Sequence, residues 1–159
     1  MTIVFIFICS FLTSFCFAFV YDAPTRLFLP AGLCGGFGYL TFFVANDVFT
    51  MDSIYASLYG SFILGIISHI MARTYKSPVI IFMVPGIIPL VPGSIFFKAT
   101  QQLLTLNFNE ASDIFVRATL IAGAIAVGLL ISDQVAKSFI RKPIQILKSP
   151  QKLSLIHIS

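Results

Sequence analysis

Residues 78–97 of the chain read PVIIFMVPGIIPLVPGSIFF. This stretch is long and apolar enough to cross a lipid bilayer, and the next charge comes only at Lys98. Its middle nevertheless carries three prolines and two glycines, and each proline lacks a backbone N–H donor. Because hydrocarbon holds no water to satisfy freed backbone groups, a broken helix survives there only inside protein or beside a water-filled cavity. The stretch therefore predicts a membrane crossing that is interrupted near its centre.

The composition places the rest of the chain in a membrane as well. Of its 159 residues, 58% are hydrophobic and only 10% are charged, whereas soluble domains carry about 25% charged residues. The net charge of +4 does not indicate nucleic-acid binding, because the basic residues lie beside apolar segments and gather toward the C-terminus. Topology determinants of membrane proteins have this distribution. We predict an all-α integral membrane protein of the lipid bilayer, with no cofactor and no metal ion.

Five apolar segments define the predicted membrane helices, and they are residues 2–20, 27–45, 53–72, 78–97 and 114–136. The fourth helix is predicted to be broken by the PGxxPxxPG segment at residues 85–93. The chain turns polar from Lys98 to Asp113, and Ser112 or Asp113 is expected to cap the fifth helix. The first segment is expected to stay in the protein, because the positive charge that begins a secretory signal is missing.

The domain organisation follows from the same pattern. Residues 1–142 are predicted to form one five-span transmembrane domain, and residues 143–159 a basic tail. Within the tail, residues 153–159 read LSLIHIS, which is what a common sequencing adapter encodes when it is translated. We interpret these residues as an artefact, so His157 enters no site argument.

The Lys and Arg residues predict the orientation. With five crossings, eight of them fall on the side of the C-terminus, and only Lys98 and Arg117 fall on the other side. Positive charge favours the cytoplasm, so the N-terminus is predicted outside and the C-terminus in the cytoplasm. A re-entrant loop at residues 78–97 would reverse the last helix, so the charge count favours a full crossing.

Small residues in the second segment predict close helix packing. Gly32 and Gly36 form a GxxxG pattern, and such spacing lets two helix backbones approach each other in lipid. This pattern indicates a compact bundle and carries no chemistry of its own.

Two ionisable residues lie within the predicted spans. His69 is near the inner end of the third segment and Asp133 near the inner end of the fifth. An ionisable side chain inside a membrane is a functional hypothesis by default, so both are candidates for ion coupling. The alternatives are an interfacial role for His69 and a plain helix-end role for Asp133.

The broken segment is the candidate substrate site, because many transporters bind their substrates at interrupted helices. A first half-helix is expected to end near Val84 and a second to start near Ser94. The positive N-terminal end of the second would suit a carboxylate, and unwound carbonyl groups at residues 86–90 would accept hydrogen bonds. The alternative is a helix that is merely kinked. The candidate pathway residues are Pro85, Gly86, Pro89, Pro92, Gly93, Ser94, Lys98 and Gln101.

The motif at residues 85–93, PGIIPLVPG, resembles the signature of the threonine/serine exporter (ThrE) family, in its small-subunit, YjjB-like branch. Residues 17–26, FAFVYDAPTR, and the glycine-rich second segment add to the resemblance, which extends to about Lys142. The chain departs from the pattern after the motif, where it has Phe96-Phe97-Lys98 and relatives often show a tyrosine. The resemblance implies a multi-pass protein of the bacterial inner membrane. It implies ion-gradient-driven export of threonine and serine, with a larger membrane subunit as partner.

The leading hypothesis is therefore the small membrane subunit of a secondary exporter of small hydrophilic metabolites. The alternatives are export of succinate or other C4-dicarboxylates in a two-subunit complex, and a non-transporting subunit that assembles or anchors a larger partner. The Pro-Gly segment is not repeated in the chain, whereas secondary transporters usually oppose two similar bundles. This favours a hetero-oligomer or a symmetric homo-oligomer. An enzyme is not predicted, because the sequence has no HExxH motif and no Ser/His/Asp set.

Overall fold

The structure is a computed structural model, and it describes residues 2–140 of the chain. In this range the chain forms helices joined by short turns, with no strand, as the sequence predicts. The elements are α1 (Thr2–Val20), the 3₁₀ turn η1 (Thr25–Leu27), α2 (Phe28–Phe43), the π-helical η2 (Val44–Val48), α3 (Ser53–Thr74), α4 (Ile80–Ile87), the 3₁₀ turn η3 (Ile88–Leu90), α5 (Gly93–Leu104) and α6 (Phe108–Ile140). Residues 141–159 lie outside the described range, so the predicted tail and the adapter-derived end stay untested.

Four of the helices in this range are long and apolar enough to cross a membrane, and they are residues 2–20, 25–48, 53–74 and 108–138. A fifth span is present if Ile80–Leu90 and Gly93–Leu104 are counted together. The pair is long and apolar enough to cross a membrane, and it is bent by 47°. The prediction of a multi-pass helical protein is confirmed. The count of five depends on this bent pair.

The first three helices alternate in direction, as the close contacts of the glycines show. A Cβ atom on Gly32 of α2 would lie 2.8 Å from the ring of Phe11, and one on Gly36 would lie 2.9 Å from the ring of Phe7. Positions that rise along α2 therefore meet positions that fall along α1, so these two helices run in opposite directions. Gly38 of α2 meets Leu64 of α3, and Phe42 of α2 meets Gly60 of α3, so α3 runs antiparallel to α2 as well.

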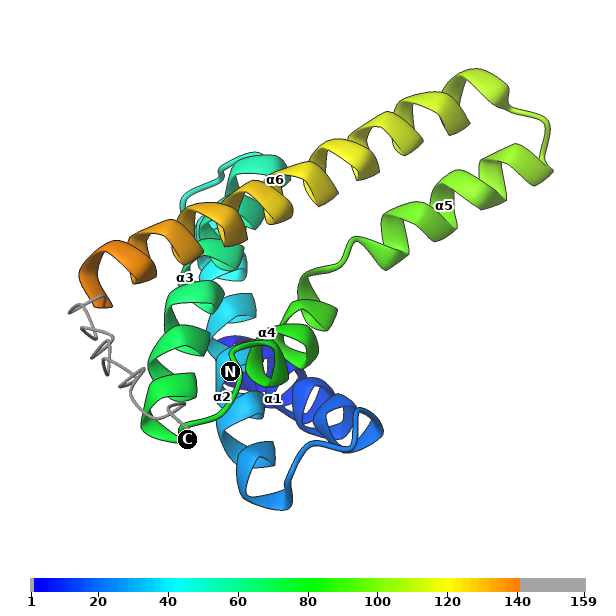
Figure 1. Cartoon of the computed structure of the whole chain (residues 1–159). Helices are drawn as coiled ribbons and strands as arrows, with labels where there is room; N and C mark the ends of the chain where they lie inside the picture. The colour runs from blue at the N-terminus through cyan, green and yellow to red at the C-terminus, as the bar shows by residue number, and fades with distance from the viewer. Residues whose placement is uncertain (1, 141–159) are drawn as a thin grey trace, which may run out of the picture.

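Helix α6 runs beside α3 in the same direction. A Cβ atom on Gly128 of α6 would meet Ser61 of α3, and one on Gly65 of α3 would meet Ser132 of α6. Residues four positions apart on one helix thus meet residues four positions apart on the other, in the same order. Because α3 and α6 start at the same end of the molecule, the chain between them must return from one end to the other. The bent α4–α5 pair makes that return (Figure 1).

Helix α5 and the first turns of α6 form a hairpin that projects from the rest of the molecule (Figure 1). We call residues 93–116 the projecting hairpin. The rings of Phe96 and Phe115 close it with an edge-to-face contact, with centroids 5.4 Å apart. Helix α6 has 33 residues, or about 50 Å at 1.5 Å per residue, which exceeds the roughly 30 Å of bilayer hydrocarbon.

The predicted start of the last helix at Ile114, with Ser112 or Asp113 as its cap, is therefore wrong. Helix α5 continues to Leu104 and α6 begins at Phe108. Ser112 and Asp113 lie inside α6, so neither caps it. Apolar residues of the two helices face each other across the hairpin, where Leu103 of α5 lines one hollow with Phe108 and Ala111 of α6.

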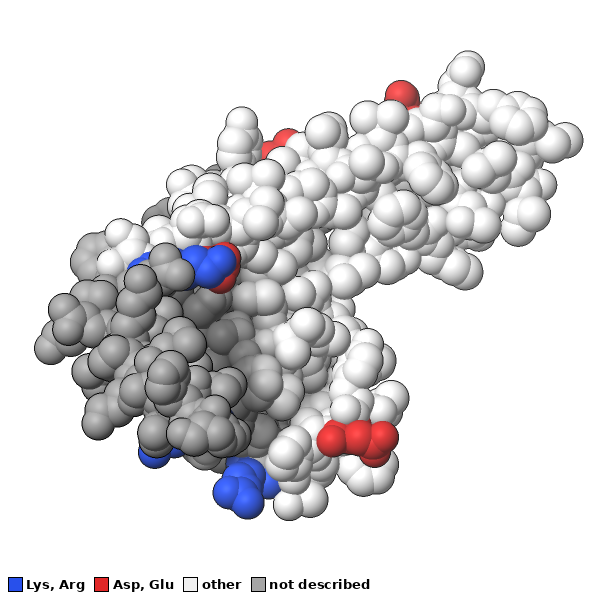
Figure 2. All heavy atoms as spheres, in the orientation of Figure 1, with Lys and Arg blue, Asp and Glu red and all other residues white. Residues whose placement is uncertain are grey.

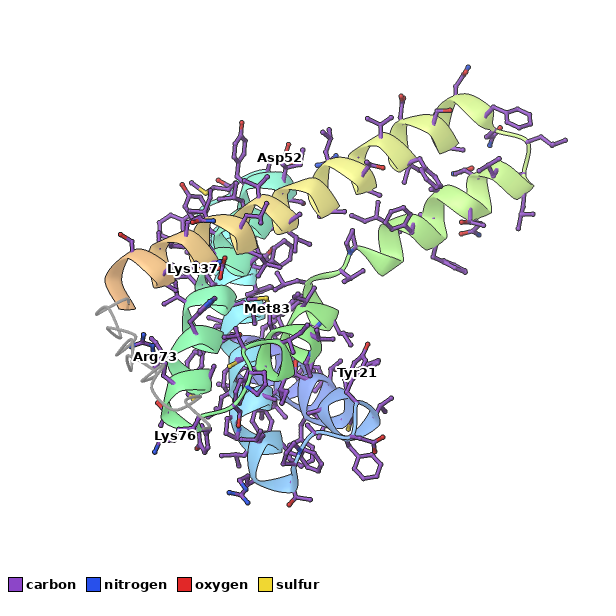
Figure 3. The ribbon with its side chains drawn as sticks, viewed as in Figure 1. Tyr21, Asp52, Arg73, Lys76, Met83 and Lys137 are labelled. Carbon is purple, nitrogen blue, oxygen red and sulfur yellow. The ribbon has the colours of Figure 1, made fainter. Side chains whose placement is uncertain are left out.

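The charged side chains separate the two ends of the helices. Figure 3 shows Arg73, Lys76 and Lys137 toward the end where α3 and α6 finish, whereas Asp52 lies where α3 begins. We call the first of these the basic end. Figure 2 shows a face that is mostly white, which means uncharged, with a few small blue and red patches, as expected for helices whose sides face lipid.

The centre of the molecule is built from small residues and a few large apolar ones. Leu27, Leu64 and Phe82 are fully or almost fully buried there, together with alanines from α1, α2 and α3. Buried serines on α1, α3 and α6 replace larger side chains at the helix contacts. Small side chains let the helices approach closely, which supplies the packing energy that lipid does not.

Candidate functional site

The bend between η3 and α5 has only two residues outside the helices, Val91 and Pro92. Val91 is extended, with φ −62° and ψ 129°, and Pro92 has φ −74° and ψ 51°. Pro92 brings no N–H to the bend, and its carbonyl accepts the N–H groups of Ile95 and Phe96 at 3.2 and 3.1 Å. No side chain caps α5. The N–H of Gly93 itself donates to the carbonyl oxygen of Val91 at 2.7 Å, so the positive N-terminal end of α5 is held by backbone contacts alone.

The first Pro-Gly pair does not end the helix, which corrects the prediction that the first half-helix ends near Val84. Pro85 and Gly86 lie inside α4, and the 3₁₀ turn continues to Leu90. Pro85 removes only the hydrogen bond to the carbonyl four residues earlier. Gly86 lets α4 approach α2 and α3, because a Cβ atom there would lie 2.6 Å from Cδ1 of Leu64. In this segment only Val91 and Pro92 lie outside the helices, so the prediction that residues 86–90 are unwound is wrong. The carbonyl oxygens of Ile87 and Ile88 accept the N–H of Val91.

The predicted pathway residues fall into two groups. The buried or half-buried group consists of Pro85, Gly86, Pro89 and Pro92, and within it Gly86 packs against α2 and α3. The exposed group lies on α5, and it consists of Gly93, Ser94, Lys98 and Gln101. A Cβ atom on Gly93 would have no neighbouring atom within 4 Å. The bend thus joins a packed half to an open half.

His69 and Asp133 lie in contact across α3 and α6, although 64 residues separate them in the sequence. Nε2 of His69 lies 3.2 Å from Oδ1 of Asp133, and Nδ1 lies 2.9 Å from the carbonyl oxygen of Gly65. The second carboxylate oxygen of Asp133 accepts a hydrogen bond from Lys137, one turn further along α6. The His69 side chain is 13% exposed and that of Asp133 is 32% exposed. We call these three residues the His69 cluster.

A pocket of about 250 Å³ adjoins the His69 cluster at the basic end. Its polar lining comes from His69, Arg73, Ser77 and Lys137, and its apolar lining from two alanines and a valine. Figure 3 shows that Arg73 and Lys137 come from different helices, α3 and α6. Sequence reasoning used these two cations only to orient the chain. Asp133 and Lys137 are four residues apart on a helix, and this spacing could have predicted the ion pair between them.

A second, larger hollow of about 590 Å³ lies where α2 passes through η2 into α3. Leu40, Val44, Phe49 and Tyr59 are among the residues that line it, and almost all of this lining is apolar. Such a surface suits lipid chains better than a hydrophilic solute. Within residues 2–140, no group of three His, Cys, Asp or Glu side chains could hold a metal ion.

Comparison with known proteins identifies the family of this chain. Residues 6–135 match the family model described as "Threonine/Serine exporter, ThrE". The chain belongs to the threonine/serine exporter family. This match runs from α1 to the region of Asp133 on α6, and so includes the bent pair and two members of the His69 cluster.

The exporter-family chain also resembles an uncharacterized protein of Haemophilus influenzae. The two are 22% identical over 121 residues, which cover 71% of this chain and 40% of that protein. This family member therefore spans about two fifths of the length of the relative it matches. No solved structure matches the chain.

Proposed function

We propose that this chain is the small membrane subunit of a secondary exporter that uses an ion gradient to move small hydrophilic metabolites of the threonine and serine type. Membership of the exporter family supports the class of activity. The small-subunit role, the substrate and the ion coupling are the parts that the following observations support and that experiments must test.

The observation that carries the proposal is the bend at Val91 and Pro92. Because α3 and α6 run in the same direction, the segment that contains the bend connects the two ends of the molecule. An interrupted helix that crosses a membrane exposes backbone groups at a depth where lipid cannot satisfy them. A passage for a polar solute supplies water and polar partners at that depth. The open space beside Gly93 and the uncapped start of α5 are where such a passage would run.

The basic end is proposed to face the cytoplasm of a bacterial cell, across the inner membrane. Arg73, Lys76 and Lys137 gather there, and positively charged connections favour the cytoplasmic side. The N-terminus of α1 would then lie outside the cytoplasm, because α1 and α3 start at the same end.

A larger membrane subunit is the proposed partner. Secondary transporters usually bind substrate between two opposed bundles, and this chain covers only 40% of the length of its longer relative. The outer face of α6 is exposed at Leu120, Val127 and Leu130. A partner bundle or lipid would cover that face.

Efflux from native cells tests the proposal, with variants replacing the natural copy of the protein. Gly93→Leu fills the open space at the bend, and Gly123→Leu is the matched control, because a Cβ atom on either glycine has no neighbour within 4 Å. Both variants should reach the membrane in normal amounts. Efflux of labelled threonine and serine should stop in Gly93→Leu and continue in Gly123→Leu. Equal efflux from the two variants would remove the bend from the transport path.

Export of succinate or another C4-dicarboxylate is the second candidate. It is favoured by the cationic and polar groups of the basic-end pocket, Arg73, Lys137 and His69, which suit a carboxylate. The same cells loaded with labelled succinate distinguish it from threonine export. The third candidate, a non-transporting assembly subunit, predicts that a partner whose abundance is restored exports substrate without this chain.

A further inference from the structure

We propose that His69 and Asp133 form a proton-binding site, in which one shared proton holds the basic ends of α3 and α6 together. The site lies beside the basic-end pocket, which residues of both helices line.

The imidazole ring of His69 has two hydrogen-bond partners. Nδ1 of His69 lies 2.9 Å from the carbonyl oxygen of Gly65, and that oxygen can only accept a hydrogen bond. Nδ1 must therefore carry a proton. Nε2 lies 3.2 Å from Oδ1 of Asp133, and an ionised carboxylate also can only accept. A neutral ring has one N–H group and cannot serve both acceptors. The geometry requires one proton more than a neutral His69 and an ionised Asp133 provide.

The surrounding charges place that proton between the two helices. Lys137 donates to the other carboxylate oxygen of Asp133 and favours its ionised form. With Asp133 ionised, the proton resides on Nε2 and is donated to Oδ1. Among the described residues that line the pocket, the remaining charged group is Arg73 on α3, and the α3–α4 connection contributes Ser77 and Val79. The carboxylate thus bridges a lysine of its own helix and the histidine of its neighbour.

Loss of the proton forces a choice between the two hydrogen bonds of His69. The bond to Gly65 lies within α3 and needs no particular position of α6. Asp133 keeps its lysine partner on α6. The contact that is given up is therefore the one between the helices. The lone pair of Nε2 would then face a carboxylate oxygen, which pushes the two side chains apart.

The packing of α3 on α6 determines which part of the two helices moves when the proton is lost. The close contacts at Ser61–Gly128 and Gly65–Ser132 lie on the side of His69 away from the basic end. Beyond His69 the two helices continue to Thr74 and Ile140. These outer turns can separate while the glycine contacts hold. The adjoining pocket of about 250 Å³ has room for water, which can take up and return the proton.

In an exporter, such a site would couple proton binding to movement at the basic end, and this use of it depends on the proposed function. The site itself does not. The test below measures proton-dependent structure and not transport, so the two proposals can fail separately.

The experiment uses spin labels on the ends of the two helices. Thr74 and Ser138 are exposed, and each is replaced by cysteine in a protein whose three natural cysteines are changed to alanine. The distance between the labels is measured in lipid nanodiscs at acidic and alkaline pH. The original Asp133 protein should show a longer distance at alkaline pH. Asp133→Asn should keep the short distance at both, because the amide N–H can donate to Nε2 of a neutral ring whose Nδ1 still donates to Gly65.

Asp113→Asn is the matched control, because Asp113 is an exposed carboxylate on the same helix. It should respond to pH as the original protein does. A distance that ignores pH in the original protein, or a pH response that persists in Asp133→Asn, overturns the proposal.

Nitrogen NMR gives a second measurement without labels. The chain has two histidines, so His157→Gln leaves His69 as the single reporter. At acidic pH both ring nitrogens of His69 should carry protons in the Asp133 protein. In Asp133→Asn at alkaline pH, Nδ1 should carry the proton. A ring that is protonated only at Nε2 under either condition would contradict the hydrogen bond to Gly65 and would overturn the proposal.

Discussion

A Cβ atom on Gly35 of α2 would lie 3.3 Å from the Cα atom of Gly86 on α4, so these two helices meet backbone to backbone. On its other side, the same Cβ atom would overlap the buried hydroxyl of Ser14 and lie 2.6 Å from the Cβ atom of Ser14. We predict that Gly35→Ala lowers the free energy of unfolding by about 1–3 kcal/mol, because a well-packed interior does not accept the extra methyl group. Thermal unfolding of the purified proteins in one detergent measures the loss.

Gly86→Ala should cost less than Gly35→Ala, although the same contact is involved. Its Cβ atom would meet the end of the Leu64 side chain, which can move. Gly123→Ala is the control without neighbours, and it should stabilise the protein by about 0.5–1 kcal/mol, because alanine favours a helix over glycine. Adding Ser14→Gly to Gly35→Ala should recover stability. Equal unfolding temperatures for Gly35→Ala and Gly123→Ala would contradict the packing described here.

The contact of α3 with α6 predicts two different outcomes for two similar glycines. Gly65→Ala would press on Ser132, including its Cβ atom at 2.7 Å. The double variant Gly65→Ala with Ser132→Gly should therefore regain most of the lost stability. Gly128→Ala would press on the Ser61 hydroxyl and also on backbone, with the carbonyl oxygen of Leu58 at 2.6 Å.

Since a backbone atom moves only with its helix, Ser61→Gly should not rescue Gly128→Ala. Unfolding temperatures of the four proteins, with the unchanged chain as reference, test both pairs. Rescue at both sites, or at neither, would show that the two glycines are equivalent, in conflict with their backbone and side-chain neighbours.

The spans were predictable from the sequence because each is a long apolar segment bounded by charges or turn residues. A break in the fourth span was predictable from the sequence, but its position was not. Pro85-Gly86 and Pro92-Gly93 are identical dipeptides, yet only the second lies at a break. The difference is tertiary, because Gly86 is packed against α2 and α3 and Gly93 faces open space. Local sequence carries no information about which glycine will find a neighbour.

The His69 cluster shows the same limit. His69 and Asp133 could each be selected as ionisable residues inside a span, but their contact depends on α3 and α6 running side by side in one direction. That direction follows from the path of the bent pair between them. The helical hairpin formed by α5 and the start of α6 was missed because residues such as Gln101, Asn107 and Asn109 give it the composition of a loop.

The ion pair of Arg117 with Asp52 links the start of α3 to α6, at a distance of 3.0 Å. Both side chains are about half exposed, so we expect it to contribute little. A double-mutant cycle with Asp52→Asn and Arg117→Gln should give a coupling energy of about 0.2–1 kcal/mol, and added salt should reduce it. A coupling energy several times larger would mean that this pair, and not the glycine contacts, fixes α6 on α3.

The direction of the helices predicts which connections share a membrane face. Thr25 follows α1 and Thr74 ends α3, whereas Asn107 lies at the tip of the projecting hairpin, and all three are exposed. Single cysteines at these positions, in a cysteine-free protein, are treated with a membrane-impermeant maleimide in intact cells. Asn107→Cys should be labelled directly, and Thr25→Cys and Thr74→Cys only after the cells are made permeable. If residues 78–107 instead entered and left the membrane on one face, Asn107 and Thr74 would be labelled under the same conditions. The parallel course of α3 and α6 argues against that outcome, because it requires the intervening chain to change sides.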